Sequence, residues 1–326
     1  MKSVDKCLRL IAAAWLLGCV AAGAARADFP DRPVRFVVPY AAGGSADQLA
    51  RALADHMAQQ LGQPVVVENK PGASTRVAAV QAARAPADGY TIFLASNSSM
   101  VLNPLLYRKL DYGAQDFRVI SVTAEMPLVL VANRQVPGDT LGQFVAYAKE
   151  RPGKLNYASV GLGNPLQLAT ELFKSRAGID VVHVPYNGSA PALTALMAGD
   201  TQIMIDVIST SLPLIRERKL KALAVASAER LEVLPEVPTV AESGYPGFRA
   251  ATWFGVALPA AAPPAAVARL VQAIDAALAT PAFRARFQTL GLAVQAPRSQ
   301  AGIDAYVQED RERWGAVIER NGIRLD

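Results

Sequence analysis

Cysteine is nearly absent from this 326-residue sequence. The only two cysteines, Cys7 and Cys19, both lie within the first 20 residues. The chain from residue 28 onward therefore cannot form a disulfide, use a thiolate nucleophile or build a cysteine metal site. A chain of roughly 300 residues without disulfides must be stabilised by its hydrophobic core, most simply in two lobes.

Histidine is equally scarce, with only His56 and His183. Two isolated histidines make a zinc site improbable, so we expect no metal and no cofactor. His56 lies in a predicted helix and is interpreted as structural, and His183 lies in a strand as a core or cleft-wall residue. The phosphate-loop motif and the G-x-S-x-G motif of hydrolases are both missing. The pair Gly161 and Gly163 lacks the third glycine of a dinucleotide site, because position 166 is Leu166.

Long hydrophobic runs and a strong charge are also missing. The formal net charge is +5, but the first 27 residues hold four basic residues and one acid, so the rest carries 29 basic and 27 acidic residues. No basic run with interleaved aromatic residues occurs, and nucleic acid is therefore not an expected partner. Charged residues interrupt every later apolar run before it reaches the length that spans a membrane.

The N-terminus has the pattern of an export signal. Three basic residues among the first nine precede an apolar run of 11 residues from Leu10 to Val20. Small residues follow, and Ala25-Arg26-Ala27 has the A-x-A form of a cleavage site. We therefore expect a signal peptide over residues 1–27 and a periplasmic protein. The alternative is a lipoprotein signal that leaves Cys19 lipidated, but Leu17 is larger than the residue usual at its position.

Short apolar runs alternate with helical patterns along the rest of the chain. The runs are not interrupted by polar alternation, so both faces of each strand are expected to be covered. This alternation is typical of an α/β fold with largely parallel sheets flanked by helices. The strands are predicted over 34–39, 65–68, 91–95, 128–132, 157–160, 181–184, 203–207 and 220–226, and the helices over 45–61, 76–84, from about 165, from about 191, 265–279 and 299–321.

In such folds ligands bind beyond the carboxyl ends of the strands. The loop after the first strand contains Ala42, Gly43, Gly44 and Ser45, and Gln48 stands at the capping-box spacing from Ser45. Glycines can take positive φ and let a ligand approach the backbone closely. A helix start also carries unpaired N–H groups and a partial positive charge, which favour a carboxylate or phosphate. The alternative is an ordinary strand-to-helix turn.

Two further loops have the same design. In the first, Gly161 and Gly163 precede Asn164, a predicted helix cap, and Gln167 completes a capping-box spacing. In the second, Tyr186 and Gly188 precede another helix. The loops 39–47, 159–164 and 186–189 contain no Lys or Arg. An anion at these loops would be held by backbone dipoles and hydroxyl groups.

Polar residues beside these loops are additional candidates. Asp47 and Arg51 have the spacing of a helix-surface ion pair, and Asp47 alternatively holds the loop in place. Asp206 ends an apolar strand, where it either caps the next helix or accepts a ligand amine or hydroxyl. Ser96 and Asn97 are predicted first as helix caps and second as ligand donors.

A series of segments resembles one protein family. PYAAGGSAD, PADGYTIFLAS, NPLLY, YASVGLGNP, VPYNGSAPA, VPTVAESGYPGF and WFGVALPA occur in this order. They are similar to those of the Bug, or TctC-like, periplasmic solute-binding proteins, which serve tripartite tricarboxylate transporters. The resemblance implies a two-lobed α/β periplasmic binding protein of the Venus-flytrap, type II-like kind, in which each lobe is a mixed, mostly parallel sheet flanked by helices. It places residues 28–127 plus about 250–326 in lobe 1, residues 128–249 in lobe 2 and the ligand cleft between them.

The resemblance also implies the ligand and its contacts. In the family, the loop after the first strand holds a ligand carboxylate through backbone groups and bridging waters. The implied ligands are di- and tricarboxylates, acidic amino acids or aromatic acids, and the implied partners are the membrane subunits of the transporter. We expect a monomer. The implied contact residues are Tyr40, Ala42, Gly43, Gly44, Ser45 and Asp47 in the first loop and Ser159, Gly161, Gly163 and Asn164 in the second.

The sequence therefore predicts a non-enzymatic solute-binding protein. Departures from the family pattern, such as Asn187 where Lys is common and Gln167 where His is common, leave the ligand open. One alternative is a ligand sensor or an orphan binder without a transporter. Another is a secreted serine hydrolase that uses Ser45 or Ser159 with His183.

Overall fold

The computed structural model describes residues 29–320 and 322–325. The predicted signal peptide, its cleavage site and Cys19 lie outside the described residues. Strands and helices alternate through most of the chain, as expected. The strands are β1 (Val34–Val38), β2 (Val65–Asn69), β3 (Thr91–Ser96), β4 (Phe117–Asn133), β5 (Asn156–Ser159), β6 (Val182–Pro185), β7 (Ile203–Val207), β8 (Leu220–Val225), β9 (Ala251–Pro259) and β10 (Ala293–Val294). The α-helices are α2 (Ser45–Leu61), α3 (Arg76–Ala83), α4 (Asn103–Leu106), α5 (Leu141–Lys149), α6 (Pro165–Ala177), α7 (Ser189–Ala198), α8 (Ile208–Arg216), α9 (Pro264–Ala279), α10 (Pro281–Gln288) and α11 (Gln300–Arg320).

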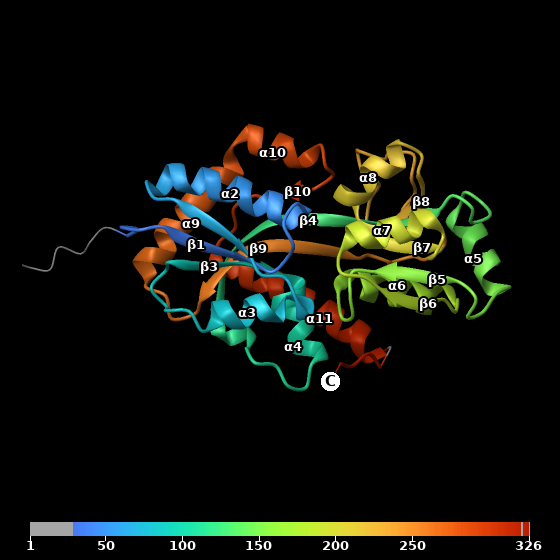
Figure 1. Ribbon diagram of the computed structural model, residues 1–326, viewed down its shortest axis with the longest axis horizontal. Helices are drawn as coiled ribbons and strands as arrows, with labels where there is room; N and C mark the ends of the chain where they lie inside the picture. Colours follow the sequence, from blue (N-terminus) through green and yellow to red (C-terminus); the bar gives the residue numbers. More distant parts are fainter. Residues whose placement is uncertain (1–28, 321, 326) are drawn as a thin grey trace, which may run out of the picture.

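One long strand joins the two halves of the molecule. β4 is 17 residues long, and it pairs with β9 as far as Pro127 and with β7 from Leu128 onward. The ten described strands follow the order β2-β1-β3-β9-β4-β7-β5-β6, with β8 and β10 also paired to β4. Figure 1 shows two bodies on either side of this change of partner, with β4 and β9 running between them.

Parallel pairing is confined to the outer strands of each body. β1 pairs in parallel with β2 and β3, and β5 pairs in parallel with β6 and β7. Every pair that includes β4 or β9 is antiparallel. The sheets are mixed, as the resemblance implies, because the chain crosses between the bodies on two antiparallel strands.

Helix α2 shows how the sequence places the first loop. Leu49, Leu53, Met57 and Leu61 repeat every four residues and are all buried. Removing such an apolar stripe from water docks the helix on the sheet. Gly62, with φ 70°, ends α2 in the left-handed conformation that glycine adopts without strain. The buried stripe directs the start of α2 toward the carboxyl end of β1.

The C-terminal helix α11 crosses from one body to the other. It packs on β4 and also contacts α6. Trp314 and Ile318 are buried, and the Trp253 indole Nε1 donates to the Asp310 carboxylate at 2.9 Å. Figure 1 shows α11 running beneath β4 and β9.

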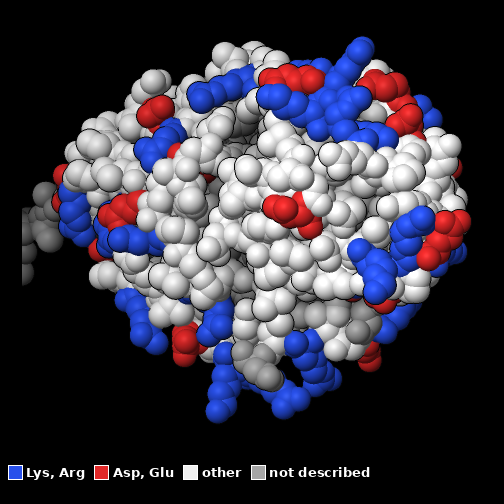
Figure 2. Space-filling view, turned by 45° about the vertical axis from the view of Figure 1, so that its right-hand side comes forward, with Lys and Arg blue, Asp and Glu red and all other residues white. Residues whose placement is uncertain are grey.

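Charge is spread unevenly over the surface. In the view of Figure 2, Lys and Arg side chains gather around the edges, while the centre is mostly uncharged. Within residues 29–320 and 322–325, no single helix is long and apolar enough to cross a membrane. The bent pair α9 and α10 passes that test by length and composition alone.

Candidate functional site

The loop between β1 and α2 is shaped by Gly43. Its φ of 88° is a conformation that residues with a Cβ rarely adopt. Gly44 is the N-cap of α2 with an ordinary φ of −76°, so the expected positive φ applies to Gly43 alone. A Cβ on Gly44 would meet only the Ala41 carbonyl oxygen, at 3.8 Å. Gly44 therefore leaves open space at the start of the helix without being required by the backbone.

The predicted capping box between Ser45 and Gln48 does not form. Because Gly44 is the N-cap, Ser45 is the first helical residue and its hydroxyl makes no cap hydrogen bond. The Gln48 side-chain amide donates instead to the Gly43 carbonyl at 3.2 Å. No hydrogen-bond partner of the Ser45 hydroxyl is found among the described residues, and this group remains available to a ligand.

Asp47 holds this loop in shape. It is 4% exposed, and its carboxylate accepts hydrogen bonds from Gly43 N at 2.9 Å, Arg51 Nε at 3.0 Å and Asn69 Nδ2 at 2.9 Å. Asn69 Nδ2 also donates to the Tyr40 carbonyl at 3.1 Å. Burial opposes ionisation, but the hydrogen bonds from Arg51, Gly43 and Asn69 outweigh it and lower the pKa of Asp47. Asp47 therefore has both of the predicted roles, since it forms an ion pair with Arg51 and also holds the loop in place.

A second helix start faces the first one. The sequence Ile208-Ser209-Thr210 begins α8 directly after β7, and the buried Ser209 hydroxyl has no hydrogen-bond partner in the part of the chain that the structure describes. The sequence analysis named Asp206, at the end of β7, as a candidate but did not single out these hydroxyls. The run of hydroxyl residues Ser209–Ser211 at a strand end was the available signal.

These two helix starts line one small cavity of about 60 Å³. Pockets that hold small organic ligands are usually about 300–1,000 Å³, so the cavity must widen to admit one. Neither Lys nor Arg lines it, and the first-turn N–H groups of both helices provide partial positive charge. Its lining residues are Gly43, Ser45 and Gln48 from one body, Ser209 and Thr210 from the other, and Phe287, Leu290 and Leu292.

The loop between β5 and α6 is closed by its own hydrogen bonds. Asn164 caps α6 as predicted, since its Oδ1 accepts from Leu166 N at 3.0 Å. Gly163 N donates to Gln167 Oε1 at 2.6 Å, and Gly161 N donates to Ser159 Oγ at 3.2 Å. The backbone donors of both glycines are therefore engaged locally. None of these residues lines the small cavity.

The remaining candidates have identifiable partners. The Tyr40 hydroxyl donates to Ser96 Oγ at 3.0 Å, and burial raises the pKa of Tyr40. Ser96 and Asn97, expected first as helix caps, make no side-chain cap. Asn97 instead joins β9, where its Oδ1 accepts from Thr252 Oγ1 at 2.7 Å and its Nδ2 donates to the Ala251 carbonyl at 3.3 Å.

Asp206 lies fully buried between the starts of α7 and α8. Its carboxylate accepts hydrogen bonds from Ser189 Oγ at 2.7 Å, Thr210 Oγ1 at 2.6 Å and Ser211 Oγ at 2.8 Å. Burial raises the pKa of Asp206 despite these hydrogen bonds. The carboxylate therefore links two helix starts.

Tyr186 and Gly188 lie in the loop between β6 and α7. Tyr186 N donates to the Ser159 carbonyl at 2.9 Å. Gly188, with φ 112°, is the N-cap of α7. Neither residue lines the small cavity.

The serine–histidine contact required by the hydrolase alternative is present, but its surroundings differ from those of a nucleophile. Ser159 Oγ lies 2.5 Å from His183 Nε2. Ser159 is completely buried, and its hydroxyl also contacts Gly161 N and O. His183 stacks on Tyr157 with ring centroids 4.8 Å apart, and burial lowers its pKa. A substrate could not reach this serine without opening the loop.

Other acid, base and metal chemistry has little support. His56 packs its ring against Phe283 at 5.5 Å between centroids, which fits the structural role expected for it. Within the described ranges, no group of three or more His, Cys, Asp or Glu side chains could hold a metal ion.

Comparison with known proteins identifies the family of this chain. The profile of the family described as "Tripartite tricarboxylate transporter family receptor" matches residues 49–323. Protein BugT of Bordetella pertussis is 35% identical over 310 residues, covering 94% of this chain and 94% of BugT. A structure of an R. palustris protein with adipate has a TM-score of 0.87 at 34% identity and covers 91% of this chain and 99% of that one. MatC from Rhodopseudomonas palustris, solved with bound malate, has a TM-score of 0.83 at 36% identity and covers 89% of this chain and 100% of that one. The chain belongs to the receptor family of tripartite tricarboxylate transporters, and its solved relatives include the periplasmic binding protein BugD.

Proposed function

We propose that this protein captures a small carboxylate outside the cytoplasm and delivers it to the membrane subunits of a tripartite tricarboxylate transporter. The observation that carries the proposal is the small cavity between the starts of α2 and α8. Two helix N-termini border it, Ser45 and Ser209 line it, and the hydroxyls of both serines have no partner among the described residues. This chemistry suits a carboxylate, which accepts hydrogen bonds and carries negative charge.

The ligand class is proposed from the same features. Adipate and malate, found with the two R. palustris relatives, are both dicarboxylates. One carboxylate would lie at Gly44 and Ser45, where the N–H groups of the first turn of α2 are free of helical partners. The β5–α6 and β6–α7 loops, with Ser159, Gly161, Gly163, Asn164, Tyr186 and Gly188, would border the ligand from the second lobe.

Closure of two lobes would trap the ligand. The proposed lobes are residues 28–127 plus about 250–326 and residues 128–249, and β4 changes partner at their boundary, between Pro127 and Leu128. A rotation about β4 and β9 would widen the 60 Å³ cavity for entry and narrow it again around the ligand. Export through the signal peptide and a monomeric state belong to the same proposal.

The variant Gly44→Ala tests the carboxylate position. A Cβ fits the free protein at this residue, so any loss of affinity reports on the approach of the ligand. Gly142→Ala, in helix α5, is the matched control because a Cβ there likewise fits without a clash, with nothing within 4 Å. In isothermal titration with adipate and malate, Gly44→Ala should bind about tenfold more weakly than the wild type, or weaker still. Gly142→Ala should bind with the affinity of the wild type. Equal affinities for all three proteins would exclude the α2 start as the carboxylate site.

The enzymatic alternative has its own test. A serine-reactive phosphonate should not label the protein, since Ser159 is buried and the Ser45 hydroxyl forms no hydrogen bond with a histidine or a carboxylate among the described residues. Labelling that Ser159→Ala abolishes would establish a nucleophilic serine. The sensor or orphan-binder alternative would be supported by ligand binding without transport by a strain that carries the membrane subunits.

A further inference from the structure

A second and larger cavity lies away from the glycine loops. It measures about 410 Å³ and is bounded by α6, by α11 and by the chain just before β9. It shares no lining residue with the small cavity between α2 and α8. Its volume is within the usual range for a site that holds a small molecule.

Four arginines surround this cavity, and no acidic residue lines it. Arg313 is paired with Asp310 at 3.4 Å. Arg176, Arg249 and Arg320 form no ion pair with any described residue. Four cations around one opening repel one another unless an anion lies between them.

Some arginines elsewhere in the chain are paired with acids, and others, such as Arg84 and Arg216, have no ion pair among the described residues. Arg35 pairs with Glu68 at 3.0 Å, and Arg51 pairs with Asp47 at 3.0 Å. This cavity is distinguished by having four arginines and no acidic side chain in its lining. Guanidinium groups bind phosphate and carboxylate through paired N–H donors, which makes a cluster of them suited to a multiply charged anion.

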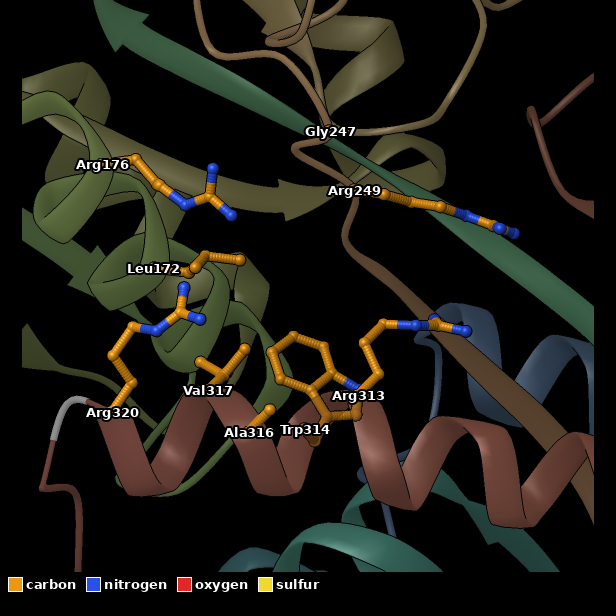
Figure 3. A pocket seen from close by; sticks show the side chains of 9 residues that line it. All are labelled: Leu172, Arg176, Gly247, Arg249, Arg313, Trp314, Ala316, Val317 and Arg320. Carbon is orange, nitrogen blue, oxygen red and sulfur yellow. The ribbon is translucent and has the colours of Figure 1, made fainter.

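The four arginines form two pairs, one toward each end of the cavity. Figure 3 shows Arg176 and Arg320 at one end of the cavity and Arg249 and Arg313 toward the other, with Leu172 and Trp314 between them. We propose that this cavity is a second binding site, for a small polyanion whose phosphate or carboxylate groups reach both ends. The apolar residues between the ends favour an anion with an apolar body.

The test uses the purified protein and two probes, inorganic tripolyphosphate and benzene-1,3,5-tricarboxylate. Isothermal titration should show one site for at least one probe. Arg176→Ala/Arg320→Ala should weaken binding by about tenfold or more, because each arginine contributes charge-assisted hydrogen bonds. The control Arg84→Ala/Arg216→Ala removes the same charge from two exposed arginines that are unpaired within the described chain, and it should change affinity less than about twofold.

The two probes and the cleft ligand separate the outcomes. Tighter binding of tripolyphosphate identifies a phosphate site, and tighter binding of the tricarboxylate identifies a carboxylate site. Adipate affinity should be unchanged in Arg176→Ala/Arg320→Ala, and probe affinity should be unchanged in Gly44→Ala. The proposal is overturned if neither probe binds, if both double variants weaken binding equally, or if Gly44→Ala removes probe binding.

Discussion

The hydroxyl of Ser74 donates a hydrogen bond to the Leu162 carbonyl at 2.7 Å, between loops 88 residues apart in sequence. Ser74 belongs to a short turn in which Ala73, Ser74 and Thr75 all have positive φ. Such conformations are strained for residues with a Cβ, and they persist where surrounding contacts hold them. Asn103 Nδ2 holds this turn by donating to the Ser74 carbonyl at 2.8 Å. The strained turn thus meets the glycine loop of the opposite body.

Ser74→Ala should therefore make the closed arrangement less stable. We expect adipate to dissociate several-fold faster, since one hydrogen bond contributes about 0.5–1.5 kcal/mol. Ser243→Ala is the matched control, because the Ser243 hydroxyl donates to Thr239 O at 2.8 Å within a single loop. Stopped-flow dissociation rates measure the difference. Equal rates for the two variants would mean that the Ser74 contact does not bear on ligand release.

Asp47→Asn should reduce the acid sensitivity of the protein. The pKa of Asp47 is lowered in the folded state, so its ionised form stabilises the fold above the unfolded value near 4, and this contribution is lost as pH falls through the folded pKa. Urea titrations should show the largest gap in free energy of unfolding between wild type and variant at pH 7. The gap should shrink below about pH 4. Asp55→Asn, an exposed acid on the same helix, should stay within about 0.5 kcal/mol of wild type at pH 7.

Gly163→Ala should destabilise the protein. Gly163 has φ 68°, and a Cβ there would lie 2.5 Å from Leu325 Cδ1 and 3.0 Å from Leu106 Cδ1. The backbone strain alone costs about 1–2 kcal/mol, and the leucine side chains must also move. Gly315→Ala, inside α11 with nothing within 4 Å, should instead stabilise by about 0.5–1 kcal/mol. Thermal or denaturant unfolding of both variants checks the opposite signs.

The variant Asp206→Ala distinguishes two roles of this carboxylate, stabilising the fold and contacting the ligand. Removing the carboxylate leaves the hydroxyls of Ser189, Thr210 and Ser211 without their acceptor, and we expect a loss of about 2–3 kcal/mol in free energy of unfolding. Asp200→Ala, an exposed acid, should have little effect. If the folded Asp206→Ala protein binds adipate tenfold more weakly while its stability is unchanged, Asp206 is a ligand contact and its supporting role is contradicted.

Local sequence patterns predicted most elements closely. The helix over 45–61 and the strand over 203–207 match α2 and β7 residue for residue. In both cases an apolar pattern of helical or strand period is bounded by glycine or a polar residue, so the information lies within the segment itself. The cap at Asn164 was predicted for the same reason.

Long-range pairing was much less predictable. The strand predicted over 128–132 is the final part of β4, whose first part pairs with β9, a strand more than 100 residues away. Helices α5 and α10 were not predicted, and α8 was anticipated only as the helix that follows Asp206. Ser45 and Ser209 line the same cavity only because of how the two bodies meet. No local sequence pattern encodes how the bodies meet. The prediction of a capping box at Ser45 was wrong because Gly44, one residue earlier, is the N-cap of α2.

The most direct test of the proposed function compares a dicarboxylate with its neutral counterpart. A thermal-shift and titration series should include adipate, malate and adipamide, which matches adipate in length without its charge. A ligand at about 100 times its Kd adds roughly 2.7 kcal/mol to the free energy of unfolding, enough to raise the melting temperature. The proposal predicts a shift with at least one dicarboxylate and none with adipamide. A shift with adipamide equal to that with adipate would contradict an anion site at the helix starts.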